Sequence, residues 1–105
     1  MLDIAPRKIA EVIVLARDED RGEPQLRAVI EDLAEEEKAS LVAVFWIGRG
    51  SYESEDLDEA VSTALQEATT PTADYLLGSP HLADHLESGL EALGHSVSDL
   101  EDDLS

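Results

Sequence analysis

The sequence predicts an all-α protein, a compact single-domain bundle of five or six helices joined by short loops. Apolar residues recur at spacings of three and four along most of the chain, which is the repeat of one buried helix face. Prolines and glycines stand where these stretches begin and end, and no segment shows the alternation typical of a strand. The length of 105 residues fits one domain of common size.

The first two helices are predicted to begin at Pro6 and Pro24, because the φ angle of proline already suits the first helical position. A charged loop over residues 18–22 separates them. Behind each proline, apolar residues follow at helical spacing and mark one inward face. These faces consist of Ile9, Val12, Ile13 and Ala16 in the first helix and Leu26, Val29, Ile30 and Leu33 in the second.

The third helix is predicted to be the central, most buried element, since residues 41–47 are apolar almost all round. Glutamates at positions 35–37 suit its beginning, where the helix dipole favours negative charge. We expect Gly48 to end this helix, because glycine adopts the left-handed conformation of a C-cap without strain.

Three further helices are predicted from capping signals. Ser51 or Ser54 is expected to cap the fourth helix. The pairs Thr70-Pro71 and Ser79-Pro80 are expected to begin a short fifth helix, which stops at Gly78, and a last helix, which Gly94 closes. The inward faces are Leu57, Ala60, Val61, Ala64, Leu65 and Ala68 in the fourth helix and Leu82, Leu86, Leu90 and Leu93 in the last.

These elements divide the chain into a single helical domain over residues 1–97 and an acidic tail over residues 98–105, which we expect to be disordered. The absence of cysteine excludes disulfides and thiolate metal sites. No apolar run approaches the roughly 20 residues of a membrane span, and the N-terminus has no secretory signal pattern. We therefore expect a cytoplasmic protein.

The net charge of −18 restricts the partners of this chain. Phosphate affinity comes from Lys and Arg, so direct binding to nucleic acid or to an anionic membrane is not expected. Three explanations of the acidity stay open. It is a solvated surface, an adaptation to high salt, or a patch that meets a basic partner or mimics nucleic acid.

Catalytic groups do not stand out in the sequence. The serines lie mostly at expected helix starts, where capping explains them, so we predict no catalytic residue and no cofactor. His81 and His85 are four residues apart on an expected helix and are the only metal-site candidates, with Asp84 between them. A zinc site needs three or four protein ligands, so we do not expect a metal.

Trp46, Arg49, Tyr52 and Tyr75 form the most distinctive group of residues. Arg49 is the last basic residue of the chain, and it stands beside the single Trp. As a binding cluster, these residue types are those that dominate protein interfaces. As a structural cluster, Arg49 would clamp the acids of the last two helices or the carbonyls at the helix end, and this second interpretation is the one we favour.

Residues 41–50, with the run Trp-Ile-Gly-Arg-Gly, and residues 75–90, with the run Tyr-Leu-Leu-Gly-Ser-Pro, resemble a small bacterial family. It is catalogued as domain of unknown function number 3775. The chain's opening at residues 4–9 is also similar to the start of that family, so the resemblance covers most of residues 2–95. The family has no established activity, and the resemblance implies no catalytic residues.

The function we expect is that of a small non-enzymatic interaction or regulatory module. Its partner would be a basic protein or a second copy of the chain. One alternative is an acidic nucleic-acid mimic that occupies a DNA-binding protein. Another is a metal-dependent enzyme that uses His81 and His85.

Overall fold

The computed structural model describes residues 4–18, 22–67 and 71–95, and these residues form an all-helical globule without strands, as predicted. The expected tail at 98–105 lies outside the described residues, as do Ala68 and Thr70. The elements are α1 (Pro6–Arg17), α2 (Gly22–Glu31), α3 (Glu35–Arg49), the 3₁₀ helix η1 (Ser54–Asp56), α4 (Leu57–Gln66), α5 (Thr72–Leu77) and α6 (Leu82–Ala92).

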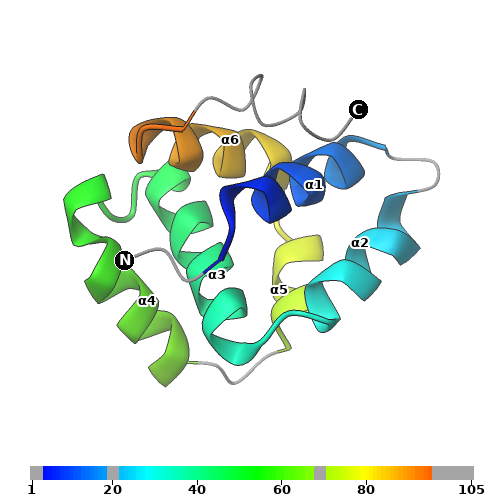
Figure 1. Ribbon diagram of the computed structural model, residues 1–105, viewed down its shortest axis with the longest axis horizontal. Helices are drawn as coiled ribbons and strands as arrows, with labels where there is room; N and C mark the ends of the chain where they lie inside the picture. The colour runs from blue at the N-terminus through cyan, green and yellow to red at the C-terminus, as the bar shows by residue number, and fades with distance from the viewer. Residues whose placement is uncertain (1–3, 19–21, 68–70, 96–105) are drawn as a thin grey trace.

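Helix α3 is the centre of the fold, as its apolar sequence predicts. It packs against α4, α5 and α6, while α1 packs against α2 and α6, and α2 packs against α5 (Figure 1). The core around it is aliphatic, with a single Phe at its middle. The largest fully buried side chains are Phe45, Ile9, Ile13, Ile30, Leu41, Leu76, Leu86, Leu90, Val12 and Val44.

The end of α3 lies two residues beyond the predicted one. Gly50, with a φ angle of 91°, is the left-handed C-cap, and Gly48 lies inside the helix. A Cβ atom on Gly48 would stand 1.6 Å from the carbonyl oxygen of His85 in α6. Gly89 of α6 has the same requirement from the other side, since its Cβ would lie 2.2 Å from the carbonyl oxygen of Val44. Gly48 is therefore needed for contact between two helix backbones and not for ending a helix.

The start of α2 also differs from the prediction, because the helix begins at Gly22, before Pro24. A proline in the first turn is tolerated, since the N–H groups there have no partner within the helix. A Cβ on Gly22 would lie 2.1 Å from the carbonyl oxygen of Leu15. The glycine thus lets the start of α2 lie against the end of α1.

The predicted serine caps do not form. The short helix η1 precedes α4, and the N-cap of α4 is Asp56, without a side-chain capping bond. The last helix begins at Leu82 behind His81, which has a left-handed φ angle of 59°. Ser79 instead donates its hydroxyl to the carbonyl of Tyr75, at 2.9 Å.

The inward faces are otherwise as expected, with one correction. Leu65 in the last turn of α4 is 47% exposed, although its spacing placed it with the buried residues.

Within the described ranges, none of the helices has the length and apolar character that a bilayer crossing demands.

Candidate functional site

The structure brings the aromatic residues of the predicted cluster together around Trp46. The indole Nε1 donates a hydrogen bond to the hydroxyl of Tyr75 in α5, at 2.9 Å. The indole also stacks on Tyr52, which lies in the connection after α3, with ring centroids 5.7 Å apart and an interplanar angle of 23°. The single Trp therefore joins the end of α3 to α5 and to the α3–α4 connection.

Arg49 contacts its own helix and the turn that follows. Its guanidinium carbon lies 5.3 Å from the centroid of Phe45, a cation–π contact with the residue one turn earlier. Its Nε donates to the hydroxyl of Ser51, at 3.1 Å. Among the described residues it makes no ion pair, so the expected clamp on acids of the last two helices is not formed. The guanidinium is held locally and stays exposed.

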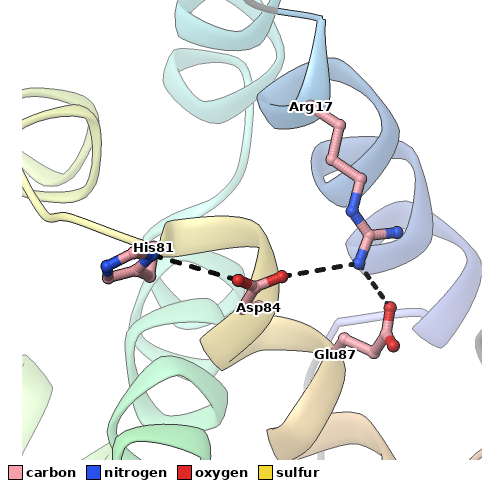
Figure 2. Close-up of polar contacts among 4 residues, drawn as sticks. All are labelled: Arg17, His81, Asp84 and Glu87. Atoms are coloured by element: carbon pink, nitrogen blue, oxygen red, sulfur yellow. Dashed lines mark hydrogen bonds and ion pairs between the residues drawn. The ribbon is translucent and has the colours of Figure 1, made fainter.

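Other arginines join the two halves of the bundle. Arg17 of α1 reaches α6, where its Nη2 lies 2.5 Å from Glu87 and 3.8 Å from Asp84 (Figure 2). Arg27 of α2 donates to Asp74 of α5, at 2.5 Å. That hydrogen bond is the main reason that the pKa of Arg27 is raised above its ordinary value. The ion pairs that join α1 and α2 to α5 and α6 are thus made by Arg17 and Arg27, not by Arg49.

A groove of about 390 Å³ lies over α3, between the last turn of α4 and the start of α5. We call it the α3–α4–α5 groove. Of the predicted cluster, Trp46 and Arg49 of α3 and Tyr75 of α5 line the groove, while Tyr52 does not. The lining also includes Ala39, Val42 and Leu65.

The ionisable groups of the groove lie toward different ends of α3. Lys38 and Glu35, near the beginning of the helix, form an ion pair at 3.5 Å. Glu67 follows the last residue of α4. Because a short connection makes α3 and α4 antiparallel, Glu67 belongs to the same end as Glu35. Arg49 lies at the opposite end of α3, roughly 20 Å away at 1.5 Å per residue.

The metal candidates lie side by side at the start of α6, without a third ligand among the described residues. His81 precedes the first residue of α6, and its side chain is 75% exposed. The rings of His81 and His85 are 6.4 Å apart, and His85 packs edge-on against Phe45. Asp84 lies 4.0 Å from His81 Nδ1 and also faces Arg17 (Figure 2). No group of three or more His, Cys, Asp or Glu suited to hold a metal occurs within the described ranges.

Lys38 lines the groove, and the sequence analysis did not single it out. It stands eight residues before Trp46, with Val42 between them, so helical spacing alone places all three on one face of α3. That spacing could have indicated Lys38. Leu65 was placed on the inward face by its spacing, and its place in the groove lining became visible only in the structure.

Comparison with known protein families assigns the chain to one of them. The family model described as "Protein of unknown function (DUF3775)" matches residues 23–95, and the chain belongs to this family. No curated protein and no solved structure matches the chain. Both runs on which the resemblance rests, Trp46–Gly50 and Tyr75–Pro80, fall within the matched segment, and the groove lies between them.

Proposed function

We propose that this protein is a non-enzymatic interaction module that binds a partner protein through the α3–α4–α5 groove. The observation that carries the proposal is the gathering of Trp46, Arg49 and Tyr75 along one hollow. The chain has only four aromatic residues, and Trp, Tyr and Arg are the side chains that supply most interface binding energy.

An exposed apolar residue beside this group supports the proposal. Among the described residues two large hydrophobic side chains are exposed, Val14 at 45% and Leu65 at 47%. Leu65 lines the groove, next to the buried Ala39 and Val42. Burying an exposed leucine against a partner removes apolar surface from water and favours association.

The chemistry of the groove supports binding more than catalysis. A nucleophile needs a base within hydrogen-bond reach and a third group that orients the base. The described lining includes no histidine and no serine, and Lys38 is paired with Glu35. The net charge of −18 would attract a partner that is basic elsewhere on its surface, and would raise the rate of encounter.

Affinity capture from a lysate of the source cells tests the proposal. The immobilised wild-type chain is expected to retain a specific protein that the Arg49→Ala and Leu65→Ala variants lose. Matched controls are Arg7→Ala, another exposed cation without a described ion pair, and Val14→Ala, the other exposed hydrophobic residue. Retention that is the same for all five proteins, or absent from all of them, would contradict the proposal.

The two alternatives have weaker support. A nucleic-acid mimic needs free acids on one face, but Glu37, Asp74, Asp84 and Glu87 each pair with a cation of this chain. Filter binding of DNA to its proteins in the presence of the chain tests the mimic. Elemental analysis of the purified protein tests the enzyme that would use His81.

A further inference from the structure

Two residues of the α3–α4–α5 groove keep hydrogen-bond donors that have no acceptor among the described residues. The hydroxyl oxygen of Tyr75 accepts the bond from Trp46, which leaves its own proton unused. Arg49 uses only its Nε, on Ser51, so its terminal nitrogens keep their four N–H groups. Both residues line the groove.

Both residues contact the same ring. Phe45 carries the Arg49 guanidinium on its face, at 5.3 Å, and meets the Tyr75 ring edge-on, at 6.1 Å. The acids of the lining, Glu35 and Glu67, belong to the other end of the groove, as described above. The Arg49 end is thus a local concentration of donors in a strongly acidic protein.

We infer that this end of the groove binds a single carboxylate, presented by a partner segment with an apolar side chain next to it. The inference rests on the proposed function and names the chemistry of the partner. A guanidinium presents a planar fork of donors that matches a carboxylate in two parallel hydrogen bonds. The hydroxyl of Tyr75 is a further donor along the same lining, available to a backbone carbonyl of the bound segment.

The charge of the protein selects one negative charge over many. Of the two cations in the described lining, Lys38 is paired and Arg49 is not, and the chain carries a net charge of −18. A phosphate-rich ligand needs several cations to neutralise it, and this surface would repel it. A lone carboxylate on an otherwise neutral or basic partner avoids that repulsion.

The rest of the groove defines the neighbouring side chain. Val42, Ala39 and the exposed Leu65 extend the lining from Trp46 along α3 and α4. A volume of about 390 Å³ is within the usual range of ligand pockets and accommodates apolar side chains of a docked segment. The expected motif is Asp or Glu, or a C-terminal carboxylate, beside Leu, Ile or Phe.

Selection from a random linear peptide library on the immobilised full chain tests this inference. Enriched peptides are expected to share an acid beside an apolar residue. The enrichment should disappear with the Arg49→Gln variant and persist with Arg7→Gln, the matched exposed arginine. Thermal melts of both variants should equal that of the wild type, which excludes unfolding as the cause.

Emission of Trp46, the only Trp in the chain, then reports whether the selected peptide occupies the groove. Titration should shift this emission. Replacing the acid of the peptide by its amide, or Arg49 by Gln, should weaken binding by about tenfold or more. Arg49→Lys should be intermediate, because it keeps the charge and loses the fork.

Enrichment of basic or uncharged peptides that bind Arg49→Gln equally well would overturn the inference, as would no enrichment or an unchanged Trp46 emission. These results differ from failure of the proposed function. If the Arg49→Ala and Leu65→Ala variants lose a captured protein but the library yields no acidic peptides, only the inference about the carboxylate is wrong. If acidic peptides bind but no protein is captured from the lysate, the proposed function is wrong and the inferred carboxylate binding is retained.

Discussion

The two sides of α3 pack in opposite ways. Toward α6, the backbones meet at Gly48 and Gly89 with no room for a single methyl group. Toward α4 and α5, the same helix leaves a groove of about 390 Å³ lined by Val42 and Trp46. One helix thus has two positions facing α6 where a side chain does not fit and another face where side chains do not fill the space.

The difference shows how side-chain size sets the distance between helices. Glycines let two helix axes approach until carbonyl oxygens and Cα atoms touch, and the interface then has no slack. On the side facing α5, the large side chains of Trp46 and Tyr75 lie between α3 and α5 and keep the two helices apart. The hydrogen bond between them fixes this separation. Rigidity and openness are therefore produced on one element by residues only two positions apart.

The largest expected effect comes from breaking the closed side. Gly48→Val should destabilise the protein by about 3 kcal/mol or more, because its Cβ would collide with the backbone of α6, which no rotamer change relieves. Thermal denaturation followed by far-UV circular dichroism measures the loss. Gly78→Ala is the milder comparison, since its Cβ would lie 3.3 Å from the carbonyl oxygen of Asp74, a tight contact but not a collision. Equal melting temperatures for both variants would show that α6 can yield.

Adding bulk on α4 should distinguish the filled part from the open one. Ala60 and Ala64 lie one turn apart and are both buried, but only Ala64 lines the groove. Ala60→Leu should cost about 1–3 kcal/mol through overpacking. Ala64→Leu should be neutral or stabilising by about 1 kcal/mol, since the added atoms fill space. Chemical denaturation measures both, and the reverse order would mean that the groove closes in solution.

A third test asks which arginine joins the two halves. A double-mutant cycle on Arg17 and Glu87 should give a coupling of about 0.2–1 kcal/mol, typical of an exposed pair, and molar salt should reduce it. Arg49→Ala should change stability by less than about 0.5 kcal/mol, because this side chain makes only local contacts. If Arg49→Ala were the more damaging change, Arg49 would be a structural clamp after all.

The smallest expected effect concerns the start of α3. Glu37 accepts bonds from the backbone N–H of Ala34 and from Lys8, each at 3.0 Å, and these lower its pKa below 4.5, the backbone bond contributing most. Because the folded pKa is depressed, the ionised form stabilises the fold at neutral pH. That contribution is lost as the pH falls from about 4.5 through the folded value.

Glu37→Gln should therefore differ most from the wild type at neutral pH, and the two melting temperatures should converge in acid. Glu36→Gln removes an exposed neighbour that has no described hydrogen bond, and its melting temperature should stay close to that of the wild type. Melts across the acid range compare the three proteins. A constant gap between Glu37→Gln and the wild type would show that the bonds do not depend on ionisation.

Helix existence could be predicted from the sequence because it depends on local periodicity. The faces of α1, α2 and α6 and the central place of α3 follow from apolar spacing, and the structure confirms them. Family membership also followed from two sequence runs, and the match over residues 23–95 confirms it.

The errors arose where tertiary contacts decide. Gly48 and Gly50 are equally good helix ends by local rules, and only the position of α6 selects Gly50. The sequence identified Arg49, Tyr52 and Tyr75 as neighbours of Trp46, but it could not predict which of them contact one another. Arg49 was expected to clamp acids of the last two helices or carbonyls at the helix end, but its described contacts are with Phe45 and Ser51.

The glycine contact between α3 and α6 also has a consequence for motion. Two helices in backbone contact cannot slide or rotate separately, so they should open only when the whole domain unfolds. Amide hydrogens around Val44 and Leu90 should then exchange with solvent most slowly, at the rate of global opening. The short helix α5, held by the Trp46–Tyr75 bond and the Arg27–Asp74 pair, should exchange earlier. Hydrogen-exchange mass spectrometry would then divide the domain into a slow pair of helices and a faster wall of the groove.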